Sequence, residues 1–548
     1  MNNPLDNKAS PYQWPVLICL LFALVLGAAN LIFGELNQDE GWYLYAAQLV
    51  KQGFQPYLDF AFTQGPMMPA VYSWFDHVVY RYGVGGGRYI TSLMGLFAAF
   101  LFSRAAHRIG GSAAAVITFA LAVVNVYQSY FTTVVKTYSL SALFLSVAFY
   151  ALARLADKRD IRWPLLAGIF LAAAAGTRLS LGILLPVVGL WLLAYRGRWG
   201  KLSWFWFGCG GAAALCLIFM PHYLRAPEGF RFGLIEFHTL RESGSVLSGL
   251  IYKGGFISRI VQAYFVAFVL LVVLAAAKVW RPFKGNCTGY HDTTQFNLIR
   301  LVMVSFVAAT LVHLSAPFPY DDYQVPVYPL LALALGVSWS YALRAWSGMG
   351  YRWQEGVAPV DPPATRWFVW SLIAILAAAS FSSPLNQEWM IAGRDRIWWK
   401  MKEEPALIQL RELARELKSM APHGILLTQD TYLAVEAALE IPMGWEMGPF
   451  SLYPHLTNEQ AKKMKLRNVD LMIEDIENTC AEVAAISGYG LSIASPDVSP
   501  LDEPSRARLL AALNEHYEHV KSVPSFGQAS TTLEIYRRKS HSSEPHHH

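Results

Sequence analysis

The sequence predicts an α-helical polytopic membrane protein with about eleven transmembrane helices, followed by a soluble α/β domain at the C-terminal end. Hydrophobic residues make up 54% of the 548 residues and charged residues only 15%, and the mean hydropathy is +0.31. Soluble proteins carry about 25% charged residues, so the first part of the chain is expected to lie in a membrane. From about residue 385 the charge density rises and the apolar runs shorten, which indicates a soluble domain.

Roughly eleven apolar runs are long enough, or nearly so, to cross a bilayer as helices. They cover residues 14–33, 88–109, 112–130, 136–155, 163–176, 179–195, 202–221, 259–280, 298–315, 324–343 and 367–384. The weak point is 163–195, where Gly176-Thr177-Arg178 divides one apolar stretch into two short spans. If that stretch were a single helix, every later loop would change sides.

Basic residues gather in alternate loops, as the positive-inside rule expects for a cytoplasmic N-terminus. Representative groups are Arg104 with Arg108, Arg196 with Arg198, and Arg344 with Arg352. This topology divides the chain into a membrane domain (1–384) with external loops 34–87 and 222–258, an external domain (385–540) and a disordered tail (541–548). We expect a multi-pass protein of a bacterial inner membrane, with the C-terminal domain in the periplasm.

Charge and cysteine usage exclude some classes of function. The net charge is only +5 and the basic residues form no single patch, so nucleic acid is not an expected partner. The five cysteines lie far apart, which indicates neither a disulfide framework nor a zinc motif.

Asp39 and Glu40 follow the first apolar run directly, where the chain leaves the membrane. On a helix their side chains diverge by about 100°, so the two carboxylates can hold different partners. One could take a proton from an acceptor while the other binds substrate or a metal ion. The alternative is that both residues only cap a helix over 41–51. The same loop adds Asp59 and Gln64-Gly65-Pro66, and a long loop tied to a membrane surface is often functional.

This loop carries a family resemblance. One span, an Asp-Glu pair, a short aromatic-rich helix, a G-x-x-P-Y-x-D turn and a Q-G-P-M-M-P segment (64–69) resemble the first external loop of GT-C superfamily glycosyltransferases. The nearest likeness is to the bacterial family 39 and aminoarabinose-transferase type, which use polyprenyl-phosphate sugars. The resemblance implies a GT-C type fold, and it maps the family's general base or acceptor ligand onto Asp39, with Glu40 beside it.

The chain departs from the nearest relatives at two cationic positions. They have a basic residue three after the Asp-Glu pair and a lysine before Pro-Pro, whereas this chain has Tyr43 and the Gln64-Gly65-Pro66 segment. The departure shifts the expected phosphate binding towards Lys136, Arg178 and Arg241. Arg88, Lys136 and Arg178 also stand at the outer ends of spans, where a cation is costly unless it meets a cavity or a phosphate. The alternative is that they anchor the helices at the interface.

Two further outer segments hold candidate ligands. The turn 316–323 presents Tyr320, Asp322 and Tyr323 before PVYPLLALALG (326–336), which matches the second half of a Tyr-rich family motif. Tyrosine hydroxyls can donate to sugar or phosphate oxygens, and an interfacial aromatic belt is the alternative. Glu236, His238 and Arg241 resemble a stretch in which relatives place a metal site. A metal site normally needs three or four ligands, so the sequence predicts no cofactor with certainty. Binding of a divalent metal ion here is one interpretation, and the alternative is that His238 is an interfacial histidine.

The C-terminal domain is expected to alternate helices with short strands. We expect helices over 403–419 and at TYLAVEAALE (431–440), and strands at GILLTQ (424–429), VDLMIEDI (469–476) and TTLEIYRR (531–538). As a function we expect it to act as a lid or to recognise the acceptor.

Together these features predict an integral membrane glycosyltransferase. It would move a sugar from a polyprenyl-phosphate donor to a hydroxyl of an envelope glycan, lipid or protein on the external face, with membrane lipid as a further partner. Asp39 would be the base, and Glu40, Asp59 and His238 would hold acceptor or metal. A transporter or flippase of lipid-linked glycans is the alternative, although transporters usually show repeated halves. A receptor-like protein would leave the Asp-Glu loop unexplained.

Overall fold

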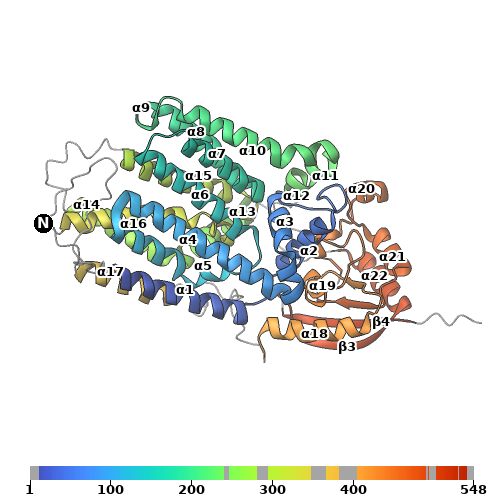
Figure 1. Cartoon of the computed structure of the whole chain (residues 1–548). Helices are drawn as coiled ribbons and strands as arrows, with labels where there is room; N and C mark the ends of the chain where they lie inside the picture. The colour runs from blue at the N-terminus through green and yellow to red at the C-terminus, as the bar shows by residue number, and fades with distance from the viewer. Residues whose placement is uncertain are drawn as a thin grey trace, which may run out of the picture.

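The computed structural model describes residues 12–239, 246–280, 294–346, 366–381, 404–488, 491–492, 501–528 and 530–539. A bundle of long helices is joined at one end to a small α/β domain (Figure 1). The main helices of the bundle are α1 (Gln13–Phe33), α4 (Asp76–Val123), α6 (Thr137–Asp157), α7 (Arg162–Thr177), α8 (Leu184–Ala194), α10 (Ser203–Arg225), α13 (Val246–Ala263), α14 (Phe265–Trp280), α15 (Thr294–Ser315), α16 (Tyr328–Trp346) and α17 (Arg366–Phe381).

Among the described residues, five helices are long and apolar enough to cross a membrane. The number is six if the bent pair α13 and α14, whose axes differ by 83°, forms one broken span. Shorter apolar helices lie at Arg162–Thr177, Leu179–Ala194 and Phe368–Ala377. The chain is therefore a multi-pass membrane protein. The predicted run 259–280 is not one straight span, because it begins inside α13 and continues past the bend into α14.

Helix α4 is a hairpin of two helices. Gly111 has φ 80° and ψ −170°, a conformation that glycine adopts without steric cost. Ser103 Oγ donates to Ala115 O at 2.9 Å, although residues twelve apart on a straight helix would be separated by about 18 Å. The chain thus reverses at Gly111, between the predicted runs 88–109 and 112–130.

The division of 163–195 into two helices is also present. Arg178 is extended, with φ −141° and ψ 108°, and ends α7, and a short helix η2 (Leu179–Ile183) then leads into α8. The turn of the α4 hairpin meets α16 at the opposite end of the bundle from the α/β domain, where Tyr341 OH donates to Ile109 O and Arg344 to Gly110 O. The loops that contain Arg108 and Arg344, which the sequence assigns to the same side of the membrane, therefore lie at the same end of the bundle.

The C-terminal domain has a four-stranded sheet of order β1-β2-β4-β3. β1 (Leu426–Thr428) pairs in parallel with β2 (Val483–Ile486), whereas β4 (Thr531–Arg538) runs antiparallel to β2 and to β3 (Tyr517–Phe526). Its helices are α18 (Ala406–Met420), α19 (Thr431–Ala437), α20 (Asn458–Lys463), α21 (Val469–Asn478) and α22 (Glu503–His516). The expected helix over 403–419 and the strands at 424–429 and 531–538 are confirmed.

The strand predicted for VDLMIEDI is wrong, because this segment forms helix α21. The Asn468 side chain accepts a hydrogen bond from Leu471 N at 2.9 Å and caps the helix start. The buried residues Val469, Met472 and Ile476 follow the three- and four-residue spacing of one helix face. The strand beside β1 is instead β2, from the short run VAAI.

The α/β domain packs directly on α2 (Gln38–Gln52), the helix that holds the Asp-Glu pair (Figure 1). At Gly41 a Cβ atom would lie 2.2 Å from Tyr432 N, so only glycine permits this approach of α2 to α19. Tyr45 OH accepts a hydrogen bond from Ile441 N at 2.9 Å. Glu436 accepts one from Val84 N at 2.7 Å, beside the kink at Gly83. These contacts fix the domain against the end of the bundle that bears the candidate site.

Candidate active site

Helix α2 begins with a capping box that uses one of the two adjacent carboxylates. Asn37 N donates to Glu40 Oε2 at 3.0 Å, and Asp39 N donates to Asn37 Oδ1 at 3.1 Å. Each contact satisfies a backbone donor that a helix start leaves unpaired. The capping alternative therefore holds for Glu40.

Glu40 also forms a sealed ion pair with Arg88. Arg88 Nε donates to Glu40 Oε1 at 2.8 Å and its Nη2 to Oε2 at 2.7 Å, and both side chains are 0% exposed. The same guanidinium donates to Gly34 O and Glu35 O, at 3.0 and 2.8 Å. Such a bidentate, fully bonded pair leaves no donor or acceptor towards a substrate. The geometry therefore points to a structural role for the predicted catalytic Glu40 and for Arg88, which was expected to bind phosphate.

Asp39 faces a different set of partners. Its Oδ2 lies 3.1 Å from Lys136 Nζ, and its Oδ1 accepts from Trp42 Nε1 at 3.2 Å. Lys136, at the start of α6, also donates to Asp322 Oδ2 at 2.8 Å. The three charged side chains keep 21%, 10% and 13% of their surface exposed, in the order Asp39, Lys136 and Asp322. The structure thus brings three predicted site residues from distant segments into one partly open cluster, the Asp39–Lys136–Asp322 cluster.

Asp322 lies in the short helix η5 (Asp321–Gln324), which precedes α16. Burial by itself would raise the pKa of the Asp322 carboxyl, but Lys136, Tyr138 and Arg178 together outweigh it and hold that pKa below its usual value. Its Oδ1 is buried and has no hydrogen-bond partner within the described part of the chain. A buried acceptor without a partner is costly, which favours a ligand or water at this atom.

Arg178 adds a second cation beside the cluster. Its guanidinium lies over the rings of Tyr323 and Tyr138, at 4.4 and 5.1 Å from their centroids, and its Nη1 donates to Thr137 Oγ1 at 3.3 Å. The Nε atom is buried, again with no partner in the segments that the structure covers. Tyr320 stacks edge-on against Tyr323, with ring centroids 5.6 Å apart. The predicted Tyr-rich turn therefore supports Arg178 by cation–π contact.

A neighbouring ion pair was not predicted. Arg259 Nε donates to Asp321 Oδ1 at 2.9 Å, and Tyr127 OH donates to Asp321 Oδ2. Arg259 lies in the apolar helix α13, and a charged residue in such a segment is itself a signal of function. With this pair the site holds three carboxylates and three cations, Asp39, Asp321 and Asp322 against Lys136, Arg178 and Arg259, so their charges balance.

Asp59 and Gln64 shape the loop and do not join the cluster. Asp59 Oδ2 accepts from Gln55 N at 2.7 Å, which closes a turn, and the backbone oxygen of Gln64 accepts from Tyr57 OH at 2.5 Å. At the next residue, Gly65, a Cβ atom would lie 1.9 Å from Gly176 O. This close approach holds the loop against the end of α7, two residues before Arg178.

The predicted metal ligands are not gathered into a metal site. Glu236 Oε1 accepts from Arg231 Nε at 2.7 Å, and the His238 ring stacks edge-on against Phe237 at 5.1 Å. No group of three or more His, Cys, Asp or Glu side chains with metal-site spacing occurs among the described residues. Arg241 lies outside the described residues.

Comparisons with known proteins agree with this architecture. Residues 64–224 match the family model described as dolichyl-phosphate-mannose-protein mannosyltransferase. The structure of ArnT from Cupriavidus metallidurans bound to undecaprenyl phosphate is similar, with a TM-score of 0.57, 15% identity and coverage of 96% of this chain and 98% of that chain. The structure of the same ArnT in the apo state is also similar, with a TM-score of 0.58, 16% identity and coverage of 96% of this chain and 98% of that chain. No curated protein sequence matches the chain.

A second kind of enzyme shares the fold. The Archaeoglobus fulgidus oligosaccharyltransferase in the apo form has a TM-score of 0.51 and 11% identity, covering 98% of this chain and 75% of that chain. The similarity to ArnT extends over both the helical bundle and the C-terminal domain, since nearly all of each chain is aligned. The chain therefore has the GT-C type fold of these two enzymes.

Proposed function

We propose that the protein is a membrane glycosyltransferase that transfers one sugar from a polyprenyl-phosphate donor to a hydroxyl of a cell-envelope acceptor. The observation that carries the proposal is the partly exposed Asp39–Lys136–Asp322 cluster, with Arg178 beside it, at the end of the bundle that the α/β domain covers. The undecaprenyl phosphate named for the similar ArnT structure supports a lipid-linked donor. The reaction takes place on the external face of a bacterial inner membrane.

Asp39 is the general base in this proposal. Lys136 and Trp42 hold its carboxylate from two sides, which fixes its orientation towards an acceptor hydroxyl. As the acceptor oxygen bonds to the anomeric carbon, its proton passes to Asp39 and the bond from that carbon to the phosphate oxygen breaks. Attack from the face opposite the leaving group inverts the anomeric centre. A positioned base of this kind typically contributes about 10²- to 10⁴-fold to the rate.

Lys136 and Arg178 stabilise the leaving phosphate, which takes the electron pair of the broken bond and gains negative charge. Arg178 supplies a second positive charge beside the cluster, and its contacts with the rings of Tyr138 and Tyr323 fix the guanidinium. Lys136 must exchange a carboxylate contact for a phosphate contact, so Asp322 acts as its resting counter-ion. Glu40 and Arg88 contribute by holding the start of α2 in place.

A divalent metal ion is a separate proposal. Glu236 and His238 supply two of the ligands that such a site uses, and Arg231 would have to release Glu236. Activity that survives dialysis against a chelator would remove this proposal and leave the reaction of Asp39 intact.

The decisive assay for the function uses purified protein in liposomes with a labelled undecaprenyl-phosphate sugar and an envelope extract. A transferase releases undecaprenyl phosphate and moves the label to the acceptor. A flippase would carry the intact lipid-linked sugar across the bilayer, and that outcome would replace the proposal with the alternative. Mass spectrometry of envelope glycans from cells with and without the gene then identifies the product.

A further inference from the structure

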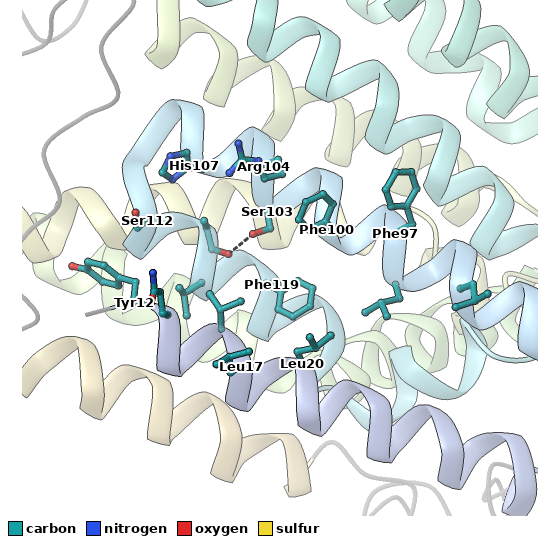
Figure 2. A pocket seen from close by; sticks show the side chains of 16 residues that line it. Tyr12, Leu17, Leu20, Phe97, Phe100, Ser103, Arg104, His107, Ser112 and Phe119 are labelled. Carbon is teal, nitrogen blue, oxygen red and sulfur yellow. Dashed lines mark hydrogen bonds between the residues drawn. The ribbon is translucent and has the colours of Figure 1, made fainter. Parts of the chain in front are cut away.

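A cavity of about 810 Å³ opens between α1 and the α4 hairpin (Figure 2). Its volume lies within the roughly 300–1,000 Å³ of ligand pockets. Phe97, Phe100 and Leu17 stand at its rim and are about half exposed, which is the expected orientation for side chains that face lipid. The cavity is separate from the Asp39–Lys136–Asp322 cluster and shares no residue with it.

The lining divides into an apolar length and a polar end. Ten of the sixteen lining residues are apolar, and the polar six are Tyr12, Gln13, Ser103, Arg104, His107 and Ser112. Figure 2 shows Arg104, His107 and Ser112 gathered around the turn of the α4 hairpin, with the labelled phenylalanines and leucines extending away from them. This is the distribution of a site for a molecule with a polar head and a long apolar tail.

The dimensions fit one leaflet of a bilayer. On the first arm of the α4 hairpin the lining residues run from Leu93 to His107, a separation of fourteen residues or about 21 Å of helix, and the second arm adds Ser112, Ala115, Val116 and Phe119. Half of a hydrocarbon core of about 30 Å is shorter than this, so an acyl chain can lie along the groove for its whole length. The polar end lies beside the basic loop that contains Arg108, on the side that the basic residues assign to the cytoplasm.

The charge at the polar end specifies an anionic head group. Arg104 is exposed, and no hydrogen bond or ion pair of its side chain occurs within the described residues. Its neighbour Arg108, by contrast, pairs with Asp157 at 2.6 Å. No carboxylate is present among the lining residues. An unpaired guanidinium above an apolar groove is complementary to a phosphate that carries an acyl chain.

We propose that this groove is a binding site for an anionic phospholipid of the leaflet on the basic-loop side, with its phosphate on Arg104 and one acyl chain between α1 and α4. The bound lipid fills the space between two helices that are joined at their other ends by Arg88, which lies on α4 and donates to Gly34 O just after α1. The lipid would thereby hold α1 and α4 at a fixed distance from each other, and this distance affects the position of the start of α2.

Native mass spectrometry of the detergent-purified full chain tests this site, with phosphatidylglycerol and phosphatidylcholine of identical acyl chains as probes. We expect the wild type to bind phosphatidylglycerol about fivefold more tightly, the factor that corresponds to one basic residue near a membrane surface. Arg104→Gln should abolish this preference and Arg104→Lys should restore most of it. The matched control is Arg196→Gln, which removes an exposed arginine of another loop on the same side and should keep the preference.

A second variant tests the groove independently of the charge. Ala115 lines the cavity and is only partly buried, so Ala115→Phe fills space and should weaken both lipids at least fivefold in folded protein. Equal affinity of the wild type for the two lipids, or an unchanged preference in Arg104→Gln, would overturn the proposal. Displacement of phosphatidylglycerol by an equal concentration of undecaprenyl phosphate would overturn it too, in favour of the donor's tail as the occupant.

Discussion

Two acid–base arrangements occupy the same end of the bundle, start from adjacent residues and have opposite character. The Glu40–Arg88 pair is fully buried, and every strong contact is with the protein itself. The Asp39–Lys136–Asp322 cluster is partly exposed, and Asp322 Oδ1 is a buried acceptor with no partner in the described chain. A charged side chain whose hydrogen bonds are all made within the protein has a structural role. A charged side chain with an unpartnered polar atom is available to bind a ligand.

The divergence follows from helix geometry. Asp39 and Glu40 are consecutive on α2, so their side chains point about 100° apart. Glu40 turns towards Arg88 and the helix start, and Asp39 turns towards α6 and the turn before α16. One dipeptide therefore supplies both the residue that locks the loop and the residue that we propose for the chemistry.

The largest expected effect concerns the sealed pair. Arg88→Met leaves Glu40 buried without its counter-ion, and breaking a buried pair in this way typically costs about 3–5 kcal/mol. We expect loss of a monodisperse peak in size-exclusion chromatography, or a strongly lowered unfolding temperature in detergent. The control is Arg162→Met, at an exposed arginine that pairs with the nearby Asp160 on the surface, and this variant should behave as the wild type. Normal unfolding of Arg88→Met would contradict the structural role.

The next largest effect is expected at the two cations of the partly exposed site, Lys136 and Arg178. Lys136→Met and Arg178→Met should each weaken binding of the lipid donor about 10- to 100-fold, in the range of one lost charge-assisted contact. The unfolding temperature of each variant is measured alongside, because Lys136 is only 8% exposed and pairs with both Asp39 and Asp322. Titration of purified protein with undecaprenyl phosphate measures the affinity. Unchanged affinity in both variants would reassign the two residues as interfacial anchors.

A smaller effect is expected at Glu446, a buried carboxylate of the α/β domain that tests how burial changes stability. Glu446 is buried in the α/β domain, where it accepts from Gly444 N at 2.8 Å. Burial raises the pKa of the Glu446 carboxyl from 4.5 to about 7. The folded state therefore holds a proton that the unfolded state has already released, and the free energy of unfolding falls as the pH rises from about 4.5 to 7.

Glu446→Gln should remove this slope and raise the stability at pH 8 by about 3 kcal/mol. Thermal unfolding at pH 5 and pH 8 measures the change, with Glu459→Gln on the exposed start of α20 as the control. An equal pH dependence in Glu446→Gln and the wild type would show that Glu446 is not held protonated.

The bundle could be predicted from the sequence because hydrocarbon imposes long apolar runs. The two helix breaks could also be predicted. The glycine pair Gly110-Gly111 marks the first break, and the segment Gly176-Thr177-Arg178 marks the second. The helix α21 was missed, because Val469, Leu471 and Ile473 also alternate as a strand would and the cap at Asn468 decides between the two. Short segments of this kind depend on local hydrogen bonds more than on hydropathy.

The candidate site was predictable in part for a related reason. Asp39, Lys136, Arg178 and Asp322 stand at the ends of spans, where an isolated charge is costly, and the structure does bring them together. The partners of Glu40 and Asp321 could not be deduced, because Arg88 and Arg259 are 48 and 62 residues away. Which charge meets which depends on the packing of helices that the sequence does not specify.

The central claim is that Asp39 does the chemistry and Glu40 the holding, and one paired measurement tests it directly. Purified Asp39→Asn and Glu40→Gln are compared in the same sugar-transfer assay at saturating lipid donor and in the same thermal unfolding scan. We predict that Asp39→Asn unfolds as the wild type and loses about 10²- to 10⁴-fold in turnover, whereas Glu40→Gln unfolds at a lower temperature and retains turnover in its folded fraction. Turnover of Asp39→Asn within about threefold of the wild type, far inside the loss expected for a base, would contradict the claim.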